Sequence, residues 1–165
     1  MDLAVLFERH HVELFRFAER FTGDADLAED VVQDAFVRLA EHPPRDESHL
    51  RAWLYRVTTT VAIDALRGAR RRQELALANV SRLPTAAPPP DPAAEAERTE
   101  LRRRVRAALQ ELETRDRTIL LMREEGFTHR EIAGAVGTTE KSVGTMIARA
   151  LAKLAQRLDL DAEDL

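Results

Sequence analysis

The chain has 165 residues, and its 29 acidic and 25 basic side chains give a formal net charge of −4. It contains no cysteine, which excludes a disulfide scaffold, a zinc finger with cysteine ligands and a thiol nucleophile. No apolar run approaches the roughly 18 residues of a membrane span, and the first residues lack the features of a signal peptide, so we expect a cytosolic protein without membrane insertion.

The apolar pattern in the first half of the chain predicts three long helices. Alanine, leucine, arginine and glutamate dominate the sequence, and apolar side chains recur at helical spacing, which predicts an all-α protein. The first helix is expected over residues 2–21 and the second over residues 25–41. Gly23 separates them, because glycine readily adopts the left-handed backbone of a helix end. The third helix is expected over residues 48–78, and we expect its Trp53 in the core.

A proline-rich segment divides the chain. Residues 79–92 hold five prolines, which interrupt helices and central strands, so we expect a semi-rigid linker there. The flanking segments, residues 1–78 and 93–158, then form two small helical domains. An acidic tail follows at residues 159–165.

The sequence of the second domain predicts four helices. The first is expected to start at Asp91-Pro92 and to end near Leu112. Thr114 is expected to cap the second helix, which Gly126 ends. Two further helices follow up to about residue 158.

These last two helices fit a helix-turn-helix motif over residues 128–151. Thr128 and Glu131 predict a capping box at the start of the shorter helix, and Gly137 allows the tight turn. The motif alone leaves an ordinary α-hairpin as an alternative. The apolar residues expected to close the core between the helices are Ile132, Val136, Val143 and Ile147. The polar residues expected on the outer face, toward phosphates and base edges, are Thr138, Thr139, Lys141, Ser142, Thr145 and Arg149.

The charges are unevenly distributed. Residues 1–66 carry thirteen acidic and seven basic side chains, whereas residues 67–73 add four arginines and no acid. Residues 99–158 carry twelve basic and eight acidic side chains. An acidic chain with two basic regions can still bind nucleic acid, because a local basic face is what meets the phosphates.

Three segments, residues 22–42, 50–72 and 108–154, resemble the sigma-70 family. Their order and spacing are similar to those of the small extracytoplasmic-function (ECF) sigma factors, which have a region-two domain, a linker and a region-four domain. The resemblance implies a promoter-recognition subunit whose partners are core RNA polymerase, promoter DNA and an anti-sigma factor. It implies no cofactor, no metal and no catalytic residue, so we do not expect an enzyme.

The resemblance also assigns roles to residues. In the family, an acid-x-x-Gln-acid signature on the second helix docks on the polymerase clamp helices, and here it reads Asp30, Gln33 and Asp34, which share a helical face. The third helix resembles the family's reader of the −10 promoter element, and the outer face of the last helix would read the −35 element. The candidate −10 contacts are Thr58, Thr59, Thr60, Arg67, Arg70, Arg71 and Arg72.

Two other functions are compatible with parts of the sequence. A sigma-like protein that binds an anti-sigma factor without binding DNA is favoured by the acidic net charge and by a last helix with few basic residues. The acid-Gln-acid signature and the run from Arg70 to Arg72 argue against it. A repressor that uses only the helix-turn-helix would leave residues 1–78 without a role.

Overall fold

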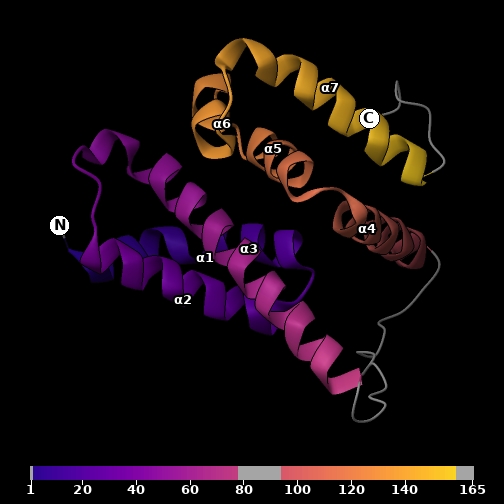
Figure 1. The fold of residues 1–165 in the computed structure, drawn as a ribbon, viewed down its shortest axis with the longest axis horizontal. Coiled ribbons are helices and arrows are strands. Elements are labelled where there is room, and N and C mark those ends of the chain that lie inside the picture. Colours follow the sequence, from indigo (N-terminus) through magenta and orange to yellow (C-terminus); the bar gives the residue numbers. More distant parts are fainter. Residues whose placement is uncertain (1, 78–93, 159–165) are drawn as a thin grey trace.

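The computed structural model describes residues 2–77 and 94–158, which form seven α-helices and one short 3-10 turn (Figure 1). The N-terminal part contains α1 (Leu3–Thr22), α2 (Ala25–Glu41), the 3-10 turn η1 (Glu47–His49) and α3 (Leu50–Leu77). The C-terminal part contains α4 (Ala94–Glu111), α5 (Thr114–Glu124), α6 (His129–Val136) and α7 (Glu140–Leu158). No strand occurs in these two ranges, and the all-α prediction is confirmed. The predicted linker and tail, and the start at Asp91-Pro92, lie outside the described residues.

Most helix ends lie where turn and capping residues predict them. Gly23 follows α1 with a φ of 77°, and Gly137 follows α6 with a φ of 65°. The Asp24 side chain accepts a hydrogen bond from the Leu27 amide at 2.9 Å and so caps α2. At the start of α6, Thr128 and Glu131 form the reciprocal hydrogen bonds of a capping box.

The prediction that Thr114 caps α5 is wrong. Thr114 is the first residue within the helix, and Glu113 occupies the capping position without a side-chain hydrogen bond. The turn between α4 and α5 is instead held from inside α5, because the Arg117 guanidinium donates to the carbonyl oxygens of Gln110 and Leu112 at 2.6 and 3.1 Å. The cation stabilises the C-terminal end of α4, while the start of α5 has no side-chain cap.

The core of the N-terminal part lies between α1, α2 and α3. Aromatic and leucine side chains from the three helices are completely buried there, including Leu14, Phe17, Phe21, Leu39, Leu54 and Tyr55. Trp53, which we expected in the core, is only half-buried and packs against its edge. Tyr55, two positions further along α3, takes the central place.

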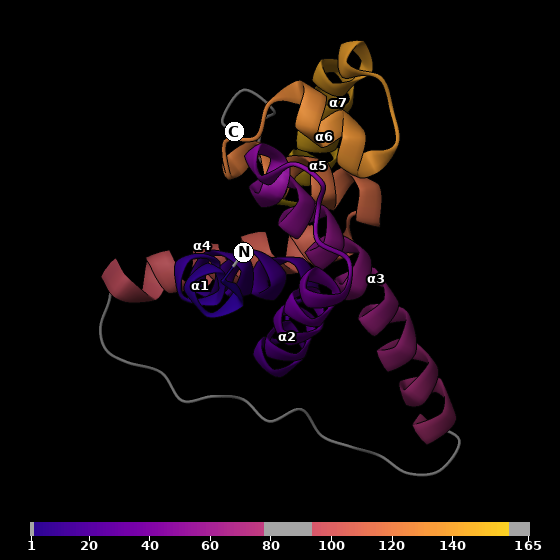
Figure 2. The same ribbon diagram turned by 90° about the vertical axis from the view of Figure 1, so that its left-hand side faces the viewer.

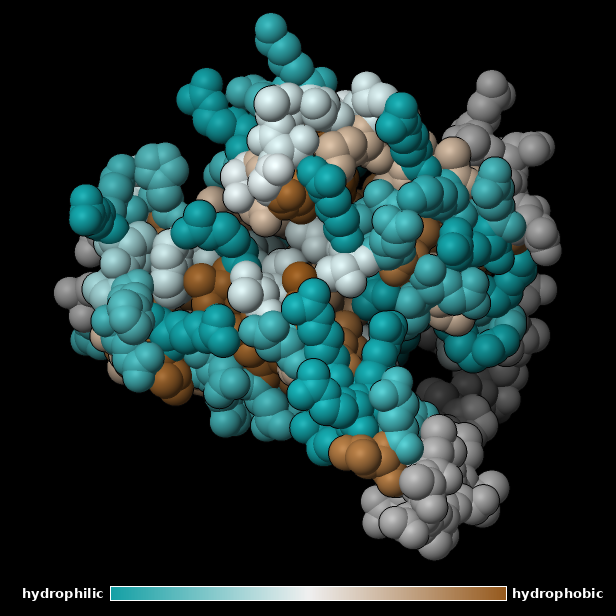
Figure 3. All heavy atoms as spheres, in the orientation of Figure 1, coloured by the Kyte–Doolittle hydropathy of each residue, from teal (hydrophilic) through white to brown (hydrophobic). Residues whose placement is uncertain are grey.

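The C-terminal part packs α5 against α6 and α7, and α4 against α7. The residues predicted to close the helix-turn-helix core are buried or half-buried: Ile132, Val136, Val143 and Ile147. Ala133 is buried where the helices cross. Hydrophilic side chains cover most of the face shown in Figure 3, and the apolar ones form small separate patches.

The two parts lie against each other. Helix α1 contacts α4 and α5, and α3 contacts α5 and α6, so one buried apolar cluster runs through both parts (Figures 1 and 2). Among the helices described, none combines the length and the apolar character needed to cross a bilayer. The relative position of the two parts decides which of the predicted binding surfaces are accessible.

Candidate polymerase and DNA interfaces

The predicted polymerase-docking residues lie on the outer face of α2. Asp30, Gln33 and Asp34 are all exposed, whereas the neighbouring Val31 and Val32 are buried. Within the described residues, neither carboxylate forms an ion pair. The exposed side chain of Val37 lies one helical turn further along this face. The face therefore offers two carboxylates, an amide and an apolar contact to a partner.

The structure contradicts two of the predicted −10 contacts. Thr58 and Thr59 of α3 are buried, so their side chains are not available to DNA. The Thr59 hydroxyl donates to the Tyr55 carbonyl at 2.8 Å, and the Thr58 hydroxyl has no hydrogen-bond partner. Thr60 is exposed and donates to the Arg56 carbonyl at 3.0 Å. Successive residues on a helix point about 100° apart, so three adjacent threonines cannot share one face.

A polar ridge runs along the outer face of α3. It consists of Arg56, Thr60, Arg67 and Arg71, which follow one another at spacings of four, seven and four residues and are all exposed. Such spacings keep side chains on one side of a helix. Arg70 and Arg72 are exposed as well but lie to either side of the ridge. Arg56 was missing from the predicted contacts, although its distance of four from Thr60 could have identified it.

The outer face of α7 is polar, as the helix-turn-helix motif predicts. Thr139, Lys141, Thr145 and Arg149 are exposed, and Thr138 and Ser142 are half-buried. The hydroxyl oxygens of Thr139 and Ser142 lie 2.8 Å apart at the start of the helix. Lys141, Thr145 and Arg149 follow at intervals of four and form one stripe, while Val143 and Ile147 face inward.

The other two basic residues of α7 are bound within the C-terminal part. Lys153 Nζ lies 2.5 Å from Asp116 Oδ2, and this hydrogen bond raises the pKa of Lys153. Arg157 Nε lies 3.4 Å from Glu111 Oε2. The cations of α7 that face outward are therefore Lys141 and Arg149, both in its N-terminal half.

Comparison with known families finds two sigma-70 regions in order along the chain. The family described as Sigma-70 region 2 matches residues 6–72, and the one described as Sigma-70, region 4 matches residues 102–154. The ECF RNA polymerase sigma factor SigL of Mycobacterium tuberculosis is 32% identical over 145 residues, which are 86% of this chain and 80% of SigL. The RNA polymerase sigma factor CnrH of Cupriavidus metallidurans is 36% identical over an alignment 169 positions long, gaps included, that covers 96% of this chain and 87% of CnrH.

A further relative is longer than this chain. The ECF RNA polymerase sigma factor SigG of Mycobacterium tuberculosis is 32% identical over an alignment 185 positions long, gaps included, that covers 93% of this chain. The chain spans about half of SigG, 48% of its length.

Solved structures show the same fold. CnrH in complex with the cytosolic domain of CnrY superposes with a TM-score of 0.67 at 29% identity, over 95% of this chain and 87% of that chain. The sigma factor RpoE from Bartonella quintana, solved with the anti-sigma factor NepR, superposes with a TM-score of 0.71 at 19% identity and covers 96% of this chain and 97% of its own. With both sigma regions present in order, and with relatives that match nearly its whole length, the chain belongs to the sigma-70 family as an extracytoplasmic-function sigma factor.

Proposed function

We propose that this protein binds core RNA polymerase in the cytosol, directs it to specific promoters and initiates transcription there. The face of Asp30, Gln33 and Asp34 docks on the polymerase, the ridge of α3 binds the −10 element, and α7 reads the −35 element in the major groove. The observation that carries the proposal is the stripe of Lys141, Thr145 and Arg149, exposed on the second helix of a capped helix-turn-helix. The polymerase supplies the chemistry, and this chain supplies recognition.

We expect the two ends of the α7 stripe to act differently on −35 elements. Lys141→Ala and Ser142→Ala, near the helix start, should change which sequences are accepted, since one base-edge contact contributes about 1–3 kcal/mol of discrimination. Arg149→Ala should instead weaken all promoters alike, as expected for a phosphate contact. A selection from a library of −35 variants with reconstituted polymerase measures both effects, and Gln156→Ala on the same helix is the control.

If neither preference nor strength changes while polymerase binding is intact, α7 does not read DNA. A sigma-like protein that binds an anti-sigma factor without binding DNA would then be the better interpretation.

If the ridge of α3 contacts DNA phosphates, removing its arginines should make DNA binding less dependent on salt concentration. Each phosphate contact to single-stranded DNA contributes about 0.7 to the slope of log affinity against log salt concentration. Arg67→Ala/Arg71→Ala should therefore lower this slope by about 1.4 in a titration of the polymerase complex with a −10 strand. Arg9→Ala/Arg115→Ala removes two exposed arginines elsewhere and should leave the slope unchanged. An equal slope for all three proteins would contradict the assignment of the ridge.

We also propose an anti-sigma factor as a partner. The similar structures of CnrH and RpoE contain the cytosolic domain of CnrY and the anti-sigma factor NepR, respectively. A run-off transcription assay with core polymerase and a promoter library distinguishes promoter recognition from the alternative function, which is to bind an anti-sigma factor without binding DNA. Specific transcripts support promoter recognition, and their absence with every promoter, while an anti-sigma factor still binds, supports the alternative.

A further inference from the structure

A cleft of about 780 Å³ lies between α1 of the N-terminal part and α4 of the C-terminal part. None of the residues that the proposed function uses lines this cleft, so that function leaves it without a role. The lining side chains are all charged, and they are Glu13, Arg16, Glu19 and Arg20 of α1, Arg102 and Arg106 of α4, and Glu125, which follows α5.

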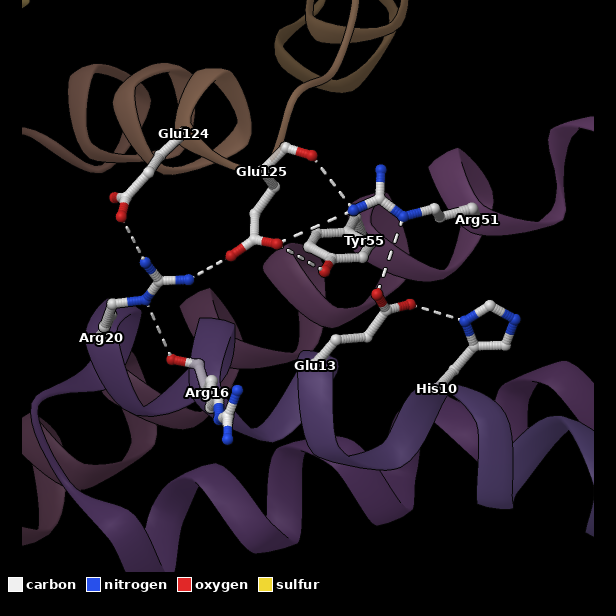
Figure 4. A network of polar contacts seen from close by, with 8 residues as sticks. All are labelled: His10, Glu13, Arg16, Arg20, Arg51, Tyr55, Glu124 and Glu125. Carbon is white, nitrogen blue, oxygen red and sulfur yellow. Dashed lines mark hydrogen bonds and ion pairs between the residues drawn. The ribbon is translucent and has the colours of Figure 1, made fainter.

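Two of the three carboxylates in the cleft face cations and a hydroxyl group of the protein (Figure 4). Glu125 pairs with Arg20 and accepts a hydrogen bond from the Tyr55 hydroxyl at 3.1 Å. Glu13 Oε2 lies 3.8 Å from Arg51 Nε. The negative charge of both groups is therefore compensated within the protein.

The arginines of the cleft are in excess over its free carboxylates. The third carboxylate, Glu19, lies 3.7 Å from Arg106. Arg16 and Arg102 are exposed and form no ion pair within the part of the chain that the structure describes. In Figure 4 no contact joins the Arg16 guanidinium to another residue drawn. The cleft therefore presents one uncompensated guanidinium on each of its two helices.

Two guanidinium groups on opposite walls of a cleft favour a ligand with more than one anionic group. A guanidinium carries its N–H donors in a planar fork that matches two oxygens of a phosphate or carboxylate group. A cleft that carries an excess of one sign of charge also raises the local concentration of ions of the opposite sign. The geometry is thus suited to a chain of phosphates.

An apolar groove of about 320 Å³ adjoins the cleft. Leu101, Val105 and Leu109 of α4 give it its apolar wall. Arg20 and Arg102 line both the cleft and the groove, so a ligand held by the arginines can place a ring against the leucines. Leu101 is 51% exposed, and a ring that covers it removes apolar surface from water. Cleft and groove together have the size of a site for a small organic ligand.

Carboxylates around the arginines argue against a long polyanion. A nucleic-acid strand in the cleft would carry its phosphates past Glu19, Glu124 and Glu125, which line the same two hollows. Like charges at close range are unfavourable. A short chain of two or three phosphates can stay on the arginines.

We propose that the cleft between α1 and α4 binds a nucleoside polyphosphate. Its phosphates contact Arg16 and Arg102, with Arg20 and Arg106 beside them, and its base lies against Leu101. This site goes beyond the proposed function, because none of its residues contacts promoter DNA or the polymerase in that function.

Isothermal titration calorimetry of the full chain, in a buffer without magnesium, tests the site with ATP, tripolyphosphate and adenosine. We expect one site for ATP, weaker binding of tripolyphosphate and no measurable binding of adenosine. Arg16→Gln/Arg102→Gln should weaken both ATP and tripolyphosphate by about tenfold or more, because two charge-assisted contacts are lost. Arg103→Gln/Arg115→Gln removes the same charge at exposed positions outside the cleft and should bind like the parent.

Leu101→Ser tests the place of the base separately. It should weaken ATP several-fold and leave tripolyphosphate unchanged, since it alters only the apolar groove. Circular dichroism checks that all variants keep their helices.

Three results would contradict the proposal. With ATP, the absence of both a heat of binding and a rise in unfolding temperature, or equal affinities of the parent and Arg16→Gln/Arg102→Gln, would overturn the site. Equal affinities of the parent for ATP and tripolyphosphate would overturn the place of the base. A ten-nucleotide thymidine strand that binds more tightly than ATP, and is lost with Arg16→Gln/Arg102→Gln, would show that the cleft takes nucleic acid instead.

Discussion

Replacing both Asp30 and Asp34 with arginine is expected to abolish binding to core RNA polymerase while α2 stays helical. Both side chains are exposed and contribute no ion pair within the described residues, so the fold does not depend on them. A basic partner would then face two arginines instead of two carboxylates, and like charges at an interface cost several kcal/mol. Since 1.4 kcal/mol corresponds to tenfold in affinity, we expect a loss of about 100-fold or more.

A titration of labelled core polymerase, followed by fluorescence anisotropy, measures this loss. Glu8→Arg/Glu100→Arg changes the net charge by the same amount at exposed positions on α1 and α4 and should bind like the parent. Circular dichroism verifies the helices. Undiminished binding by the Asp30→Arg/Asp34→Arg protein would show that this face of α2 does not dock on polymerase.

The second large effect is expected at Arg117, where replacement by methionine should lower the free energy of unfolding by about 3 kcal/mol. Within the described residues this buried guanidinium has no carboxylate partner, and it is balanced by carbonyl oxygens at the ends of α1 and α4. Burial, and then the charge of Arg70, lower the pKa of Arg117. Methionine leaves three backbone carbonyl groups without this donor but also removes a buried charge, so the loss stays below the sum of the hydrogen bonds.

Urea unfolding of the full chain measures the difference. Arg117→Lys should lose an intermediate amount, because one ammonium group cannot reproduce the planar fork that reaches both helix ends. Arg115→Met, two positions away and exposed, should change stability by less than about 0.5 kcal/mol. A protein with Arg117→Met that unfolds like the parent would show that water replaces the guanidinium at both helix ends without cost.

Helix positions could be predicted from the sequence because they depend on local chemistry. Apolar spacing set the extent of α1, α2 and α7, and the backbone freedom of Gly23 and Gly137 set where helices end. We expected all three adjacent threonines of α3 to contact DNA, but the helical period points them to different faces of the helix. Applied residue by residue, that period would have grouped Thr60 with Arg56 and placed Thr58 inside.

The contact between the two parts could not be predicted in the same way. Tyr55 and Glu125 are 70 residues apart, and Arg117 is 96 residues from the carbonyl that it caps on α1. No local motif marks these pairs. A charged residue such as Arg117 on a predicted helix is expected to face solvent, and only the position of the other part shows that it is buried.

The connection through residues 78–93 gives the contact between the two parts a further property. Two groups joined by a short tether encounter each other at an effective concentration on the order of 1 mM, whatever the concentration of the protein. An intrinsic affinity as weak as about 1 mM, or roughly 4 kcal/mol, would then keep the two parts in contact in half of the intact molecules. Severed from each other at micromolar concentration, the same two parts would scarcely associate. A single proteolytic cut between Leu77 and Ala94 would therefore separate the two parts irreversibly, without a change in any residue of their contact.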